Sequence, residues 1–150
     1  EIGGGMKDGL KLKAVIPGGA SCPILTAEEV QNAYLDYESM WDIGSTLGTG
    51  GMMIIPEGVS MVDVAKNLIE FYHHESCGQC TPCREGTGWI DKIIGKVLEG
   101  EGSSADLETI LDVCETMNGK TVCVFAPAVK DIIKSIVQKY KHEFEAQFKN

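Results

Sequence analysis

Three cysteines with a strict three-residue spacing are the residues of this sequence best suited to chemistry. Cys77, Cys80 and Cys83 stand in a short segment that Gly78 and Pro82 interrupt. Three thiolates so close in sequence can bind three corners of one compact polynuclear centre and leave its last corner to a remote residue. A cubane iron–sulfur cluster is held in this way, by four cysteine thiolates. The spacing therefore predicts a [4Fe–4S] cluster.

The fourth ligand must come from another part of the chain, and two cysteines compete for this role. Cys123 follows the segment after a gap of 39 residues, in a stretch that contains an Asn-Gly turn signal. Cys114 lies among apolar residues at helical spacing, where a free cysteine is usually a small core residue. We therefore expect these four ligands of the cluster: Cys77, Cys80, Cys83 and Cys123.

Zinc is the main alternative occupant of such a site. Structural zinc sites usually take their ligands as two pairs, each pair on its own turn. In this sequence the cysteines are arranged as three plus one, which favours an iron–sulfur cluster. A structural zinc module that binds a partner and has no redox function stays open as an interpretation from a different class.

Composition and charge are those of a globular protein that does not bind polyanions. The 150 residues are 43% hydrophobic and 23% charged, with a formal net charge of −9. This negative charge argues against binding to nucleic acid or to anionic membranes, which require basic patches. No secretory signal opens the sequence, and the longest uncharged run, residues 43–56, is too short to span a bilayer. We therefore expect a reducing, cytoplasmic compartment, where closely spaced cysteines more often bind metal than form disulfides.

The sequence from residue 58 onward predicts amphipathic helices. Ser60 with Asp63, and Ser103 with Asp106, have the spacing of helix caps, in which a serine side chain accepts a hydrogen bond from a backbone N–H three residues on. Apolar residues at helical spacing predict four helices, over about 60–74, 83–98, 103–117 and 127–148. Four such helices with short connections indicate a four-helix bundle.

The order of these helices also predicts how the cysteines meet. In an up-and-down bundle, the connection between the first two helices lies at the same end as the connection between the last two. Cys123 would then join the other three cysteines. The helices that begin near Cys83 and Pro127 direct the positive ends of their dipoles to this place, and Arg84 and Lys120 add cations. The site therefore suits a negatively charged cluster.

Residues 1–57 have the character of strands, turns and a connector. A strand is predicted over residues 11–16, where a Pro-Gly-Gly turn ends it, and the apolar run 52–55 is interpreted as a buried strand. The two tryptophans, Trp41 and Trp89, are interpreted as packing residues. Together the two parts of the chain predict an α+β protein that is mostly α.

The segment 74–86, with the sequence HESCGQCTPCREG, resembles closely the cluster motif of the flavoprotein subunit of NADH:quinone oxidoreductase, respiratory complex I. Residues 17–21, 36–38 and 47–51 are also similar to that family. There the flavoprotein transfers hydride from NADH to FMN, and electrons then pass singly through a [4Fe–4S] cluster. The resemblance implies that the four cysteines named above are its ligands.

The resemblance also implies how the chain is divided. Residues 58–150 would be the cluster-binding four-helix bundle, and residues 1–57 a partial β-grasp segment of the ubiquitin-like, soluble-ligand-binding type with a connector. The domain that binds FMN and NADH in the family has no counterpart here. We therefore expect a C-terminal part of an oxidoreductase subunit, without catalytic residues of its own, whose FMN and NADH are bound by the full-length subunit only.

Partners and location follow from the same resemblance. It implies contacts with other peripheral-arm subunits, including iron–sulfur subunits, and neither nucleic acid nor direct membrane insertion. The location would be cytoplasmic and peripheral to the inner membrane, or the mitochondrial matrix in a eukaryote. The diaphorase subunit of an NAD-linked hydrogenase or formate dehydrogenase shares the motif and stays open as the nearest alternative.

Overall fold

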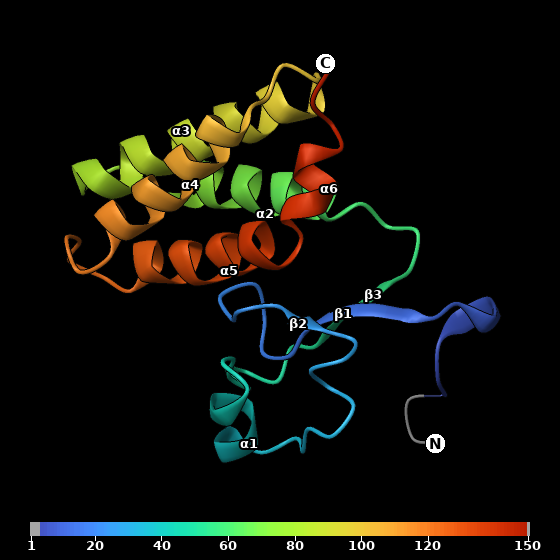
Figure 1. The fold of residues 1–150 in the computed structure, drawn as a ribbon. Helices are drawn as coiled ribbons and strands as arrows, with labels where there is room; N and C mark the ends of the chain where they lie inside the picture. The colour runs from blue at the N-terminus through green and yellow to red at the C-terminus, as the bar shows by residue number, and fades with distance from the viewer. Residues whose placement is uncertain (1–3, 150) are drawn as a thin grey trace. The chain divides into compact units, whose positions relative to one another are not determined.

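The computed structural model describes residues 4–149 of the chain. The chain divides into two compact units between Val59 and Ser60 (Figure 1). The first unit contains a small sheet, and the second consists of helices. The expectation of an α+β protein that is mostly α is therefore confirmed.

The first unit is built on a three-stranded antiparallel sheet with the strand order β2-β1-β3. Its strands are β1 (Leu12–Ile16), β2 (Leu25–Thr26) and β3 (Met53–Pro56). Its helical segments are η1 (Lys7–Gly9) and α1 (Tyr37–Asp42). Asp36 begins α1, because its carboxylate accepts a hydrogen bond from the backbone N of Ser39 at 2.7 Å.

Two expectations for the first unit are wrong. The run before Pro56 is not a buried strand, because only Ile55 is buried, whereas Met52, Met53 and Ile54 are exposed. β3 lies at the edge of the sheet with β1 as its one described neighbour, so no further described strand flanks its side chains. Trp41 is 64% exposed and does not pack into the core; its ring lies 6.3 Å from that of Tyr37.

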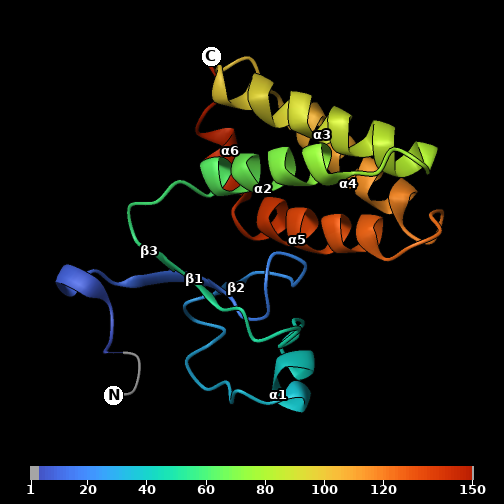
Figure 2. The ribbon, with the colours of Figure 1, turned by 180° about the vertical axis from the view of Figure 1, so that it is seen from behind.

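In its described part, residues 60–149, the second unit has four long helices and one short one. They are α2 (Met61–Glu75), α3 (Thr81–Leu98), α4 (Ser104–Met117), α5 (Phe125–Lys139) and α6 (Lys141–Glu145). α2 packs on α3, α3 on α4, α4 on α5, and α5 on α2, so the long helices enclose one core (Figures 1 and 2). None of the helices in residues 4–149 combines the length and the apolar character that a membrane crossing requires.

Local signals determine where these helices begin and end. Ser60 accepts a hydrogen bond from the N of Asp63, and Ser103 from the N of Asp106, each at 3.3 Å, as the spacing predicts. After α3 the chain reverses at Gly100, whose φ of +80° is accessible to glycine at little cost. The core is formed by fully buried apolar side chains, among them Ile69, Ile90, Ile94, Ile110, Ile132, Ile133 and Ile136.

The last predicted helix, over 127–148, is interrupted at Tyr140. This residue has φ −116° and ψ 24°, which is not helical, and it separates α5 from α6. The break has a tertiary cause. α6 contacts α2, where a carboxylate oxygen of Glu143 accepts a hydrogen bond from the N of Met61 at 2.9 Å, and Phe144 is completely buried. Glu143 thereby satisfies an N–H group that has no partner within α2.

Candidate metal centre

Four cysteines line one cavity of about 180 Å³ in the second unit. Cys77, Cys80 and Cys83 come from the connection between α2 and α3 and from the first turn of α3, and Cys123 comes from the connection between α4 and α5. The structure therefore brings the four residues of the sequence analysis to the same place. Their role as ligands stays a prediction.

The backbone of the α2–α3 connection explains how cysteines so close in sequence reach the same cavity. Gly78 has a φ of +76°, so the chain can turn sharply between the first two cysteines. Cys80 is the residue before the first turn of α3, and Pro82 lies within that turn, where its missing N–H is not needed. Cys83 is therefore carried on a helix and is buried, whereas Cys77 lies on the loop and is exposed.

Among the described residues, two of the four thiols have hydrogen-bond partners. The Oγ of Ser76 lies 3.5 Å from the Sγ of Cys83. The backbone N of Val122 donates to the Sγ of Cys80 at 3.4 Å. The second bond joins the two connections, which are 42 residues apart in the chain, and so holds them together around the cavity.

Arg84 closes the cysteine loop and adds positive charge beside it. Its Nη1 donates to the carbonyl oxygen of Gly78 at 2.7 Å, and its Nε donates to a carboxylate oxygen of Glu85 at 2.8 Å. The Arg84 side chain is about half exposed. The expectation of a cation near the cysteines is therefore met by a residue that also restrains the loop.

The helix starts at the cavity differ from those at the opposite end of the unit. α3 begins after Cys80 and α5 begins after Val124, and within the described residues no side chain caps either helix. The first N–H groups of a helix carry partial positive charge and readily bind an anion. The cavity thus combines four thiols with two uncapped helix N-termini.

The donor set fits a cluster held by thiolates. Within residues 4–149, no three side chains of His, Cys, Asp or Glu converge closely enough to hold a single metal ion. The four thiols are distributed around a cavity, and Phe125 adds an apolar wall to it. Thiolates are soft ligands that bind iron–sulfur clusters and zinc. Four thiols that line one cavity therefore suit a polynuclear centre.

The other two cysteines lie in hydrophobic cores. Cys114 is completely buried on α4, as its position in the apolar pattern predicts. Burial raises the pKa of the Cys114 thiol to about 12, so this group stays protonated at neutral pH. Cys22 is buried in the first unit.

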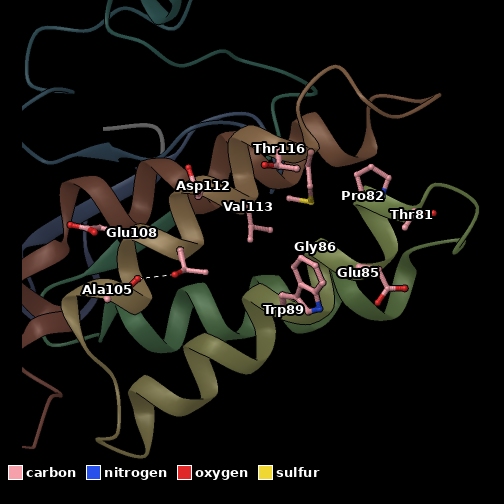
Figure 3. A pocket seen from close by; sticks show the side chains of 12 residues that line it. Thr81, Pro82, Glu85, Gly86, Trp89, Ala105, Glu108, Asp112, Val113 and Thr116 are labelled. Atoms are coloured by element: carbon pink, nitrogen blue, oxygen red, sulfur yellow. Dashed lines mark hydrogen bonds between the residues drawn. The ribbon is translucent and has the colours of Figure 1, made fainter.

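A larger groove, of about 750 Å³, lies between α3 and α4 and has a different chemistry (Figure 3). No cysteine is among its lining residues, whereas Glu85, Glu108 and Asp112 bring three carboxylates to it. Trp89 lines it and is 54% exposed, so its interpretation as a packing residue is wrong. The signal was present in the sequence, because Trp89 precedes the core residue Ile90 and adjacent helical residues point about 100° apart.

A polar cluster joins α2 to α3 outside both cavities. Lys66 contacts one carboxylate oxygen of Asp91 at 2.5 Å, and the Nδ1 of His73 lies 3.1 Å from the other. Burial alone would raise the pKa of the Asp91 carboxyl, but the hydrogen bonds from Lys66 and His73 outweigh it and lower this pKa below its ordinary value. We interpret the cluster as a tie between the two helices.

Comparison with known proteins identifies the family of the chain. Residues 63–147 match the family model described as the NADH-ubiquinone oxidoreductase-F iron-sulfur binding region. The F subunit of the NADH-quinone oxidoreductase of Escherichia coli (strain K12) is 41% identical over 150 residues, which cover 99% of this chain and 34% of the relative. The F subunit of the Rickettsia typhi enzyme is 38% identical over 148 residues, covering 98% and 35%. The chain thus spans about a third of the length of these relatives.

Solved structures show a similar fold. The crystal structure of an NAD⁺-reducing [NiFe]-hydrogenase in the H₂-reduced state aligns with a TM-score of 0.76 and 26% sequence identity, over 93% of this chain and 24% of that chain. The air-oxidized state of such a hydrogenase aligns with a TM-score of 0.77 and the same identity and coverage.

Proposed function

Because this chain belongs to the family of the NADH-ubiquinone oxidoreductase-F iron-sulfur binding region, we propose that it binds one [4Fe–4S] cluster and carries electrons within an NADH dehydrogenase. The observation that carries the proposal is the single cavity that Cys77, Cys80, Cys83 and Cys123 line together. When bound there, the cluster would supply one-electron chemistry, with FMN reduced by NADH as the donor and an iron–sulfur group of a partner subunit as the acceptor.

The chain's own residues would hold this group and set its charge environment. The four cysteines would bind as thiolates. The uncapped first turns of α3 and α5 would direct their N–H groups toward the resulting negative charge. Arg84 would hold the loop in shape through Gly78 and favour the reduced state, which carries more negative charge. These residues perform no bond chemistry.

The finer architecture belongs to the same proposal. The four long helices would form a four-helix bundle that corresponds to residues 58–150. Residues 1–57 would be a partial β-grasp segment and its connector, consistent with the small sheet around β1. No residue of this chain is assigned to FMN or NADH, which would bind to another part of the full-length protein.

We further propose that the chain works in a multisubunit complex. Its partners would be other subunits of the peripheral arm, including iron–sulfur subunits, and its location would be the cytoplasmic side of the inner membrane or the mitochondrial matrix. The net charge of −9 supports protein partners over nucleic acid.

A second candidate is the diaphorase subunit of an NAD-linked hydrogenase or formate dehydrogenase. The structural likeness to an NAD⁺-reducing [NiFe]-hydrogenase favours it. The two NADH-quinone oxidoreductase relatives share more sequence identity with this chain than the hydrogenase does, which favours the NADH dehydrogenase. The genes adjacent to this one would distinguish the two candidates, because each parent complex has its own set of subunits.

Iron and sulfide analysis tests the proposal directly. We expect about four irons and four sulfides per chain after anaerobic preparation, and a low-temperature EPR signal after reduction with dithionite. Stoichiometric zinc, with no cluster after reconstitution with iron and sulfide, would contradict the proposal and leave the structural zinc module.

A further inference from the structure

Ser76 places a hydroxyl group against the sulfur of a predicted ligand. The backbone N of Ser76 donates to the carbonyl oxygen of Tyr72 at 3.1 Å, which ends α2 and fixes the position of the residue. Its Oγ lies 3.5 Å from the Sγ of Cys83. Within the described residues, Ser76 provides the one side-chain hydrogen bond to any of the four thiols.

Ligation determines the direction of this hydrogen bond. Either atom can donate while Cys83 is a thiol. A cysteine bound to iron has lost its proton, so only the Ser76 hydroxyl can then donate. The backbone N of Gly78 donates to the same Ser76 oxygen at 3.4 Å. The N–H, the hydroxyl and the sulfur then form a chain of hydrogen bonds with one direction, in which each bond polarises the next.

Burial makes the sulfur of Cys83 the one at which a protein donor matters most. Cys83 is 8% exposed, whereas Cys77 and Cys123 are exposed and Cys80 is intermediate. Water can donate to the sulfurs of exposed cysteines and replace a lost protein donor. At Cys83 water has little access, and hydrogen bonds are stronger where the local dielectric constant is low.

We propose that the Ser76 hydroxyl raises the reduction potential of the cluster by donating a hydrogen bond to Cys83. The inference rests on the proposed function. Reduction by one electron adds negative charge that the ligand sulfurs share, and a hydrogen bond to a charged acceptor strengthens as that charge grows. Hydrogen bonds to the sulfurs are among the features that set the potential of an iron–sulfur cluster. Ser76 thus tunes the cluster and is not one of its ligands.

A redox titration followed by EPR tests the inference on the cluster-loaded chain. We expect a lower midpoint potential for Ser76→Ala and for Ser76→Val, which lack the hydroxyl. Ser76→Thr keeps a hydroxyl and should stay close to the unmodified chain, so the Thr and Val variants form a pair of nearly equal shape. Thr109→Val is the control, because Thr109 lies on α4, is not among the residues that line the cysteine cavity, and donates its hydroxyl to the carbonyl oxygen of Ala105 at 2.8 Å. Its midpoint should not change.

The outcomes separate this inference from the proposed function. An unchanged or higher midpoint in Ser76→Ala, with four irons and four sulfides still bound, would overturn the inference and leave the function intact. If Ala and Val both lost the cluster while Thr kept it, the hydroxyl would serve binding and not tuning, which also overturns it. Failure of the unmodified chain to bind any cluster would contradict the proposed function instead.

Discussion

The two ends of the helical unit differ in how the backbone N–H groups at their helix starts are satisfied. Where α2 and α4 begin, Ser60 and Ser103 each accept a hydrogen bond from one N–H of the first turn, and Glu143 accepts one from the N of Met61 at the start of α2. Where α3 and α5 begin, no described side chain provides a cap, and a cavity lined by four thiols lies beside the helix starts. The end where α2 and α4 begin, the capped end, therefore has side-chain acceptors for helix N–H groups, whereas the end where α3 and α5 begin, the cysteine end, has none among the described residues.

We infer that one end of the unit mainly stabilises the fold and that the other end mainly provides the binding site. Phe144 is completely buried where α6 contacts α2, so apolar packing and caps hold the capped end together. The cysteine end has four thiols and the partial positive charge of two helix N-termini, which would bind the proposed cluster. A substitution at the cysteine end should therefore change cluster binding more than the free energy of unfolding, and a substitution at the other end should do the reverse.

Cys80→Ala should have the largest effect, because it removes one of four thiolates at the cavity. We expect a missing or incomplete cluster in iron and sulfide analysis, with the helices retained in far-UV circular dichroism. Cys114→Ala is the matched control: this cysteine lies in the core, so the variant should lose stability but keep four irons. A complete four-iron EPR signal in Cys80→Ala would refute the assignment of the ligands.

Phe144→Ala should produce the largest loss of stability at the opposite end. Truncating a fully buried phenylalanine costs about 3–5 kcal/mol, through lost burial and the cavity that remains. Urea unfolding followed by circular dichroism measures this, and iron content at low temperature should stay normal. Phe71→Ala, at a half-exposed residue, serves as the control and should cost much less. Equal losses of stability in the two variants would contradict the inference that the packing of Phe144 stabilises this end.

Asp91 lies between the two ends and predicts a smaller, pH-dependent effect. Its folded-state pKa is lowered from 3.8, so its contribution to stability is complete above 3.8 and is lost as the pH falls through the lower, folded value. Asp91→Asn should therefore be less stable than the unmodified chain near neutral pH, and the difference should shrink in acid. Urea unfolding of both chains across this range measures the difference. A gap that does not depend on pH would show that the Lys66 and His73 contacts are not responsible.

Arg84→Ala should have the smallest effect, confined to the cysteine end. Removing the positive charge should lower the midpoint potential of the cluster modestly, because the half-exposed Arg84 side chain is screened by solvent. Arg84→Lys keeps the charge but loses the paired contacts with Gly78 and Glu85. Its midpoint potential should therefore lie between those of the unmodified chain and Arg84→Ala. An EPR-monitored titration with an unchanged or higher midpoint for Arg84→Ala would count against this role.

The sequence predicted those features whose causes are local. The serine caps at residues 60 and 103 are read from four neighbouring residues, and they are where the spacing places them. The meeting of Cys123 with the other cysteines follows from the number and order of the helices, which the apolar spacing reveals. The caps depend on four neighbouring residues, and the meeting of the cysteines depends on helices that can each be predicted from their own stretch of sequence.

The features that were missed have causes elsewhere in the chain. Apolar spacing continues through Ile136, Tyr140 and Phe144, so it predicts one unbroken helix. The break at Tyr140 depends on the bond between Glu143 and the N of Met61, 82 residues away, which no local pattern reveals. The exposure of Trp89 is a different case, because its position beside the core residue Ile90 was a local signal and the residue type alone suggested packing.

The origin of the cavity in two connections has a consequence for biosynthesis. A ribosome adds about 5–20 residues each second, so Cys83 is made roughly 2–8 s before Cys123. During that interval three of the four cysteines exist without the fourth and without α5. If these four cysteines are the ligands, as proposed, the site would be complete only once Cys123 and the start of α5 have been made. Cluster delivery would then follow the synthesis of the helices that come after the cysteine motif.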